Sequence, residues 1–160
     1  MYLYERHYCP STWAKNKPVK KKTNFTAKVY NWHDGTFKKV KFKDVEHITC
    51  RKGYWRKANE IHRFFVDKCA DGVDDCREVV VETEVLKELR DICEQLLKLK
   101  GKAFEQKAQE LLPTQDGFFF GGTQYDKWYR WDLRQTLKII KGLNLDNDDY
   151  NVDYIYRASW

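Results

Sequence analysis

Apolar positions in the second half of the chain recur with the 3.6-residue period of an α-helix. The strongest stripe, in residues 84–99, predicts an amphipathic helix that buries one side in the core. That stripe consists of Leu86, Leu89, Cys93, Leu96 and Leu97. Gly101 ends it, and a shorter helix is predicted over residues 102–112. Pro113 stops this second helix, because proline lacks the backbone donor that a helix needs.

Two further helices are predicted on either side of this pair. One spans residues 54–69, directly after Gly53, and the other spans residues 124–141. Thr83 and Thr123 suit the N-cap positions of the helices that follow them. A threonine hydroxyl in that position accepts a hydrogen bond from a free amide of the first turn.

Short runs of β-branched and aromatic residues predict strands near both ends of the chain. Residues 25–32 and 36–42 are typical of a hairpin, because the Asp-Gly pair between them is a strong turn signal. Two single strands are predicted over residues 78–82 and 152–157.

Together these elements predict an α+β fold, with an N-terminal basic β-hairpin followed by a mainly helical domain with short strands. Helices and strands do not alternate regularly, which argues against a doubly wound parallel sheet. Two prolines and the run Lys20-Lys21-Lys22 predict that residues 1–24 form an extended basic arm. Residues 25–160 are expected to form a single α+β domain. Its parts are the hairpin (25–43), a helical part (53–142) and a C-terminal strand (152–157).

Positive charge is concentrated at the start of the chain. Residues 1–57 hold 15 Lys/Arg against 4 Asp/Glu, whereas residues 58–160 hold 15 against 20. This asymmetry fits an anionic partner for the first third of the chain. It fits equally well a strongly charged edge hairpin, because lysines on edge strands prevent unwanted pairing. Both interpretations stay open.

Cysteine usage and hydropathy indicate an intracellular protein. Five irregularly spaced cysteines do not resemble a secreted disulfide framework, and they include no CxxC pair of a zinc site. Structural thiols are therefore favoured over a metal centre. The candidate ligands for a zinc ion are His47, Cys50, Cys69 and Cys76. No apolar run reaches the roughly 18 residues of a membrane span, so no membrane partner is expected. We also expect no cofactor and no metal.

Residues 54–66 combine large rings, cations, an amide and a histidine on one predicted helix. A core helix rarely needs so many polar donors, whereas stacking faces and donors together suit a planar or anionic ligand. Three consecutive phenylalanines at 118–120 add to this picture, because in a strand they cannot all face one core. The predicted ligand-binding residues are Trp55, Arg56, Lys57, Asn59, His62, Arg63, Gln115, Phe118, Phe119, Phe120, Tyr125 and Trp128.

Three groups of residues carry a resemblance to a known family. They are GYWRKAN at 53–59 with Ile61 and His62, DGVDDC at 71–76, and LLPTQ at 111–115 followed by GFFFG at 117–121. Over about residues 53–160 this combination resembles a family of small proteins of tailed bacteriophages and prophages. The family has no settled activity or catalytic residues to transfer. The resemblance implies a phage-encoded protein that acts in the host bacterial cytoplasm.

The favoured hypothesis is a non-enzymatic binding protein that modulates the host. It would act against a defence system, either by sequestering a nucleotide signal or by occluding a host protein. A base would stack on Trp55 or Phe119, and a nearby cation would hold the phosphate. The exposed aromatics fit a homodimer as well as a ligand pocket.

An alternative is a single-stranded nucleic-acid-binding accessory protein, because lysines of the arm and hairpin are interleaved with possible stacking platforms. The residues predicted for this role are Lys20, Lys21, Lys22, Lys38, Lys39, Lys41, Lys43, Tyr30 and Trp32.

A third possibility is a nucleotide hydrolase in which His62 acts as a general base, oriented by Asp74 or Asp75. The sequence contains no phosphate loop, dinucleotide-binding fingerprint or nucleophile elbow, so catalysis ranks last. His62 also lies on the apolar stripe of its predicted helix, where a packed, hydrogen-bonded histidine is the favoured interpretation.

Overall fold

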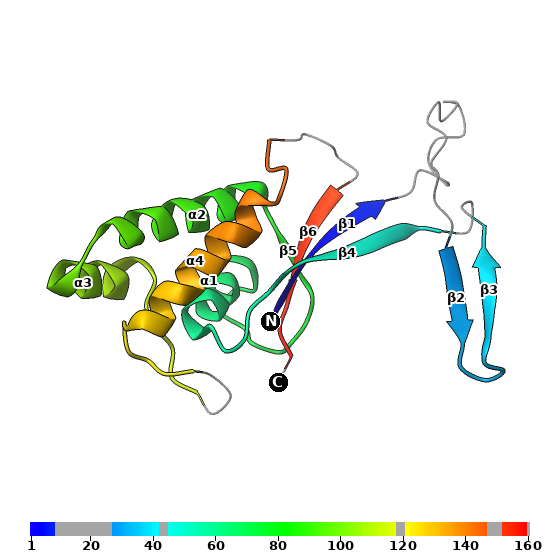
Figure 1. Cartoon of the computed structure of the whole chain (residues 1–160), viewed down its shortest axis with the longest axis horizontal. Helices are drawn as coiled ribbons and strands as arrows, with labels where there is room; N and C mark the ends of the chain where they lie inside the picture. Colours follow the sequence, from blue (N-terminus) through cyan, green and yellow to red (C-terminus); the bar gives the residue numbers. More distant parts are fainter. Residues whose placement is uncertain (9–26, 42–44, 118–120, 147–151, 160) are drawn as a thin grey trace.

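The fold is α+β, as the sequence predicts. The computed structural model describes residues 1–8, 27–41, 45–117, 121–146 and 152–159 (Figure 1). In chain order the elements are β1 (Tyr2–Tyr8), β2 (Ala27–Asn31), β3 (Thr36–Val40), β4 (His47–Tyr54), α1 (Asn59–Cys69), β5 (Val79–Val81), α2 (Thr83–Lys98), α3 (Gly101–Leu111), α4 (Lys127–Lys141) and β6 (Val152–Arg157). The predicted hairpin, the short strand near residue 80 and the final strand over residues 152–157 are confirmed.

Four strands form the central sheet, in the order β4-β1-β6-β5, with antiparallel neighbours throughout. Residues 2–8 therefore form an inner strand and not the start of the predicted arm. Successive side chains point to opposite faces of the sheet, so that Leu3 and Glu5 are buried while Tyr2 and Tyr4 are partly exposed on the other face. The terminal amine also donates a hydrogen bond to the carbonyl oxygen of Trp55 at 3.1 Å.

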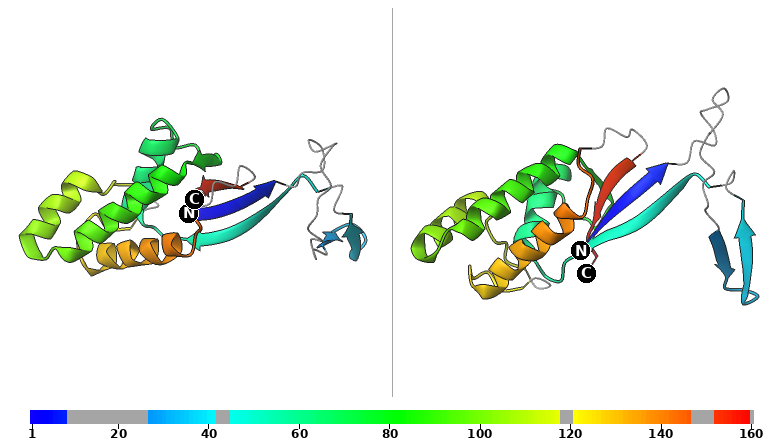
Figure 2. Two further views of the ribbon diagram at one scale, coloured as in Figure 1. Left: turned by 90° about the horizontal axis from the view of Figure 1, so that it is seen from above. Right: turned by 45° about the horizontal axis from the view of Figure 1, so that its top comes forward.

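The helices gather at one end of the molecule and the β2–β3 hairpin lies at the other, in every view of Figures 1 and 2. The face of the sheet that carries Leu3, Tyr154 and Tyr156 shares one hydrophobic core with the inner sides of the helices. The predicted stripe of α2 supplies four buried residues, Leu86, Leu89, Cys93 and Leu96. None of the described helices is long and apolar enough to cross a membrane.

Helix α1 begins at Asn59, five residues later than predicted, because residues 47–54 extend the sheet as β4. This strand runs very close to α4. A Cβ on Gly53 would lie 2.6 Å from Cγ2 of Ile139, so only glycine fits there without a shift of the Ile139 side chain. Residues 55–58 then connect the sheet to α1, and this connection carries several of the predicted ligand-binding residues.

Neither predicted threonine cap is present. Helix α4 begins after Asp126, whose carboxylate accepts hydrogen bonds from the amides of Trp128 at 2.7 Å and Tyr129 at 3.3 Å. An ionised cap at the positive end of a helix dipole is at least as effective as a hydroxyl. At α2 the N-cap is Glu82, without a side-chain hydrogen bond, and Thr83 is already helical.

Candidate ligand-binding pocket

A cavity of about 490 Å³ lies between the start of α1 and the first two turns of α4, beside the loop that precedes α4. Its described lining residues are Arg56, Lys57, Glu60, Gly121, Gly122, Gln124, Asp126, Trp128, Tyr129, Trp131 and Asp132. Pockets for small molecules commonly have volumes of about 300 to 1,000 Å³ and combine apolar walls with a few converging polar groups. This cavity meets both criteria.

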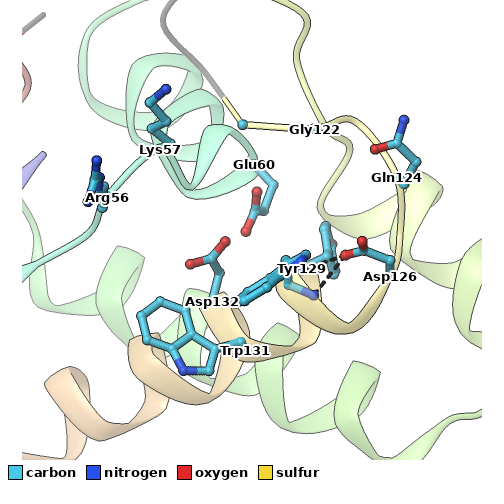
Figure 3. Close-up of a pocket in the computed structure, with 11 residues that line it drawn as sticks. Arg56, Lys57, Glu60, Gly122, Gln124, Asp126, Tyr129, Trp131 and Asp132 are labelled. Carbon is cyan, nitrogen blue, oxygen red and sulfur yellow. Dashed lines mark hydrogen bonds between the residues drawn. The ribbon is translucent and has the colours of Figure 1, made fainter.

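Two carboxyl groups from different helices face each other in this cavity (Figure 3). Glu60 of α1 is only 3% exposed, and within the described part of the chain its Oε1 has no hydrogen-bond partner. The pKa of Glu60 is raised to about 8, mainly by burial and to a smaller extent by the charge of Asp132. The pKa of Asp132 is raised to about 7, mainly by burial and to a smaller extent by the charge of Asp126. At neutral pH Glu60 is therefore mainly protonated and can donate as well as accept a hydrogen bond.

Two indole rings on α4 supply the flat apolar surface beside this acidic pair. Trp128 is 63% exposed and Trp131 is 46% exposed, which is unusual for the largest apolar side chain. Because the two residues are three positions apart on one helix, their side chains project from neighbouring parts of its surface. The rings are therefore available for stacking.

Arg56 and Lys57 supply positive charge from the connection between β4 and α1, and both are exposed. They lie across the drawn pocket from Gln124 and Asp126 (Figure 3). The backbone of Lys57 is left-handed, with φ of 63°, a conformation that non-glycine residues seldom adopt. Its carbonyl oxygen accepts a hydrogen bond from the amide of Gly121 at 3.2 Å, so the two walls of the pocket are joined at this point.

The loop between α3 and α4 is held in place by polar side chains of α1. Asn59 Nδ2 donates to the carbonyl oxygen of Gly122 at 3.0 Å, and Asn59 Oδ1 accepts from the amide of Gln115 at 3.0 Å. Arg63 Nη1 donates to the carbonyl oxygen of Thr114 at 3.2 Å. Asn59 and Arg63 were predicted to contact a ligand, but their side chains bind the loop that shapes the pocket.

Tyrosines of the same region complete the anchoring. The hydroxyl of Tyr125 accepts a hydrogen bond from the amide of Thr114 at 3.3 Å. The hydroxyl of Tyr129 donates to the carbonyl oxygen of Leu112 at 2.7 Å. Tyr125, a predicted ligand-binding residue, therefore has a structural partner, and Gln115 takes part in this network through its backbone.

Trp55 is the clearest correction to the predicted site. It is 1% exposed, and its Nε1 donates to Oγ1 of Thr136 on α4 at 2.9 Å. The sequence prediction placed Trp55 in a helix and assigned its ring to ligand binding. Because β4 continues to Tyr54, the next side chain enters the core between the sheet and α4.

His62 is also buried and is held on both sides. Nδ1 lies 2.6 Å from the hydroxyl of Tyr156, and Nε2 lies 3.0 Å from Oδ2 of Asp74. The contact between His62 and Asp74 that a hydrolase would need is therefore present. The cavity beside these residues is only about 10 Å³, however, which is about the volume of a single water probe and leaves no room for a nucleotide. This geometry favours a structural role for His62 over a catalytic one.

Of the predicted ligand-binding residues, the cavity brings together Arg56, Lys57 and Trp128. Phe118, Phe119 and Phe120 lie outside the described residues, as do Lys20, Lys21, Lys22 and Lys43 of the nucleic-acid alternative. The remaining residues of that alternative belong to the hairpin or directly follow it. They are Tyr30, Trp32, Lys38, Lys39 and Lys41.

Sequence reasoning missed Glu60 and Asp132 and left Trp131 out of the predicted ligand-binding residues, although all three line the pocket. One feature of the sequence does point weakly to Glu60. Glu60 lies next to Ile61 and one turn before Phe64, so an acidic residue occurs at the edge of an apolar stripe. Nothing in the sequence relates that residue to Asp132, since the two meet only through tertiary packing.

No protein-family model, curated protein or solved structure matches this chain.

Proposed function

We propose that the chain is a binding protein that captures a nucleotide-class small molecule in the pocket between α1 and α4. One observation supports this most strongly. A single cavity of about 490 Å³ contains exposed indole rings and a buried carboxyl oxygen that lacks a partner among the described residues. Such a volume accommodates a ligand of nucleotide size. A flat aromatic patch would instead have favoured the occlusion of a host protein.

Each part of a nucleotide has complementary groups around this cavity. A base can stack on Trp128 or Trp131, an interaction worth ~1–3 kcal/mol per base. Arg56 and Lys57 can hold a phosphate through charge-assisted hydrogen bonds. Glu60 can pair with the polar edge of the base, which would satisfy a group whose burial without a partner is costly.

Binding ranks above catalysis for this pocket. A carboxyl pair with raised pKa values is also found in acid–base catalysts. The described lining residues, however, include no serine, cysteine or histidine to act as a nucleophile or proton carrier with the pair. The paired carboxyls therefore fit recognition of a ligand better than its chemical conversion.

The resemblance to phage proteins suggests a biological setting for this proposal. A phage-encoded protein that sequesters a nucleotide signal would weaken a host defence system that depends on that signal. In this setting the ligand is a host nucleotide, and the protein acts by lowering its free concentration.

Isothermal titration calorimetry of the full chain with mononucleotides, dinucleotides and cyclic nucleotides of each base tests the proposal. We expect saturable heat with at least one nucleotide and a loss of affinity of about tenfold or more in Trp131→Ala, as the loss of one stacking ring predicts. Trp32→Ala, which removes an exposed indole far from the pocket, should bind like the wild type. Absence of heat with all nucleotides, or unchanged affinity in both Trp131→Ala and Trp128→Ala, would reject the proposal.

A further inference from the structure

The β2–β3 hairpin carries an exposed aromatic cluster on one of its faces. Tyr30 and Phe37 are a directly opposed cross-strand pair, with ring centroids 5.1 Å apart. The ring of Trp32 lies 5.0 Å from that of Tyr30 in an edge-to-face arrangement. Trp32 is 87% exposed and Phe37 is 65% exposed, so this cluster is not part of the hydrophobic core. Apolar rings that cluster on a surface commonly mark an interaction site.

Two lysines lie next to the rings on the same face. Lys28 and Lys39 are opposed to each other across the hairpin, two positions from Tyr30 and Phe37. Like charges directly opposite each other destabilise a strand pair. Within the described ranges neither lysine forms an ion pair that would offset this repulsion. An anionic partner bound to this face would remove it.

Lys38 is not part of this arrangement. It is paired with Val29, so its side chain projects from the opposite face of the hairpin. The sequence prediction treated the lysines as one track, whereas the strand register assigns them to two faces. Only the face with Lys28, Lys39 and the three rings combines charge with stacking surfaces, and we name it the ring face.

The turn of the hairpin does not contribute positive charge. Asp34 Oδ1 accepts hydrogen bonds from the amide and hydroxyl of Thr36, at 2.9 and 2.6 Å, and Oδ2 accepts from Asn31 at 2.7 Å. These hydrogen bonds, of which those from Thr36 contribute most, lower the pKa of Asp34 and keep its carboxylate ionised. Insertion of the tip into a lipid surface would bury this charge. The ring face is therefore the better binding surface.

We propose that the ring face binds a single strand of nucleic acid. Exposed aromatic rings stack on unpaired bases, and lysines beside them contact the phosphates, which is the general pattern of sequence-tolerant single-strand binding. A duplex could meet the lysines, but its paired bases could not reach the rings. This site lies at the far end of the molecule from the pocket between α1 and α4 (Figures 1 and 2), so it is independent of the proposed nucleotide capture.

Fluorescence anisotropy with labelled 20-mers of deoxythymidine and of uridine tests the inference on the full chain. We expect saturable binding to one or both oligomers, and weaker binding as salt rises. The double variant Lys28→Ala/Lys39→Ala should reduce the slope of log K against log salt by about 1.4, since each phosphate contact on a single strand contributes about 0.7. Trp32→Ala should weaken binding by about tenfold without changing that slope.

Matched variants at the other end of the molecule serve as controls. Trp128→Ala removes an exposed indole, and Lys98→Ala/Lys102→Ala removes two exposed lysines of the helical end. Neither should alter strand binding. Circular dichroism of the hairpin variants should match that of the wild type, since the substituted side chains lie on the surface.

Three outcomes would overturn the inference. The first is no binding to either oligomer, including the case in which the protein binds phosphatidylserine vesicles instead. The second is an equal loss of binding in the hairpin and control variants, and the third is equally tight binding to a duplex of the same length. Trp32→Ala tests the hairpin and is a control for the pocket, whereas Trp128→Ala tests the pocket and is a control for the hairpin. Rejection of one proposal therefore does not reject the other.

Discussion

Trp55 donates a hydrogen bond from its indole Nε1 to the hydroxyl of Thr136 at 2.9 Å, inside the core. Thr136 is fully buried, and its hydroxyl donates in turn to the carbonyl oxygen of Asp132 one turn earlier. This chain of bonds joins the connection after β4 to the turn of α4 that carries a pocket residue. The part of the pocket wall that Asp132 forms is therefore bonded to the core.

Thr136→Val tests this link. Valine has nearly the shape of threonine but leaves the Trp55 indole donor buried without an acceptor, so the free energy of unfolding should fall by ~1–3 kcal/mol. Urea unfolding followed by tryptophan fluorescence measures the change. Thr49→Val is the control, at an exposed position of β4 where the hydroxyl accepts a solvent-exposed hydrogen bond from Arg6 Nε at 3.3 Å, and it should change stability by about 0.5 kcal/mol or less. Equal stabilities of the two variants would show that the bond contributes nothing.

Gly121 is predicted to accept no side chain. A Cβ at this position would lie 2.9 Å from the carbonyl oxygen of Lys57, which also accepts the Gly121 amide. Gly121→Ala should therefore push the loop from the β4–α1 connection and destabilise the protein by ~1–3 kcal/mol, as overpacking typically does.

Gly122→Ala is the matched control, because the added methyl group would meet only the end of the Gln124 side chain, which can rotate away. Urea unfolding and nucleotide affinity should both distinguish the two glycine variants. If Gly122→Ala proves as harmful as Gly121→Ala, the contact with Lys57 is not what fixes the loop.

Local signals in the sequence were sufficient for much of the fold. The leucine stripe of α2 and the Asp-Gly turn of the hairpin each depend on neighbours within a few positions, and both elements form as predicted. Strands β1 and β4 were missed because their stability comes from distant partners. Leu3, for example, pairs with Gly53 on one side and with Tyr156 on the other.

The pocket was predictable only in part for the same reason. Arg56, Lys57 and Trp128 stand out by residue type, and the structure places them at the cavity. Glu60 and Asp132 are ordinary acidic residues of amphipathic helices until packing of α1 against α4 desolvates them. A perturbed pKa arises from the environment of a group, which a sequence does not display.

The raised pKa of Glu60 predicts that stability falls as pH rises. Between its ordinary pKa of 4.5 and the folded-state pKa of about 8, the folded protein keeps a proton that the unfolded chain has lost. Rising pH therefore favours unfolding across this window, and the effect is constant above it. Asp132 adds a change of the same sign between 3.8 and about 7.

Glu60→Gln removes the Glu60 contribution, since a glutamine is neutral at every pH. Relative to the wild type, the variant should gain roughly 3 kcal/mol between pH 5 and pH 8, because the wild type loses up to 1.36 kcal/mol per pH unit in this window. Urea unfolding at several pH values measures this gain. Glu105→Gln, at an exposed position of α3, should show no such trend. A difference between Glu60→Gln and wild type that does not vary with pH would contradict the assigned pKa.

Protonation of Glu60 also predicts which bases the proposed pocket prefers. A neutral carboxyl group presents one donor and one acceptor side by side, which matches the amino group and ring nitrogen of adenine. An ionised carboxylate only accepts, which matches the two donors of guanine. Because the pKa of Glu60 is about 8, adenine nucleotides should bind more tightly than guanine nucleotides at pH 7.

Raising the pH should reverse this preference. Above pH 8 the affinity for adenine nucleotides should fall by about tenfold per pH unit, as expected when binding requires a proton that the free protein loses. In Glu60→Gln the side-chain amide keeps both a donor and an acceptor, so adenine binding should persist and should lack the tenfold fall per pH unit above pH 8. Calorimetry at pH 7, 8 and 9 compares the two proteins. Wild-type adenine binding that stays constant to pH 9, or tighter binding of guanine at pH 7, would mean that Glu60 does not contact the base.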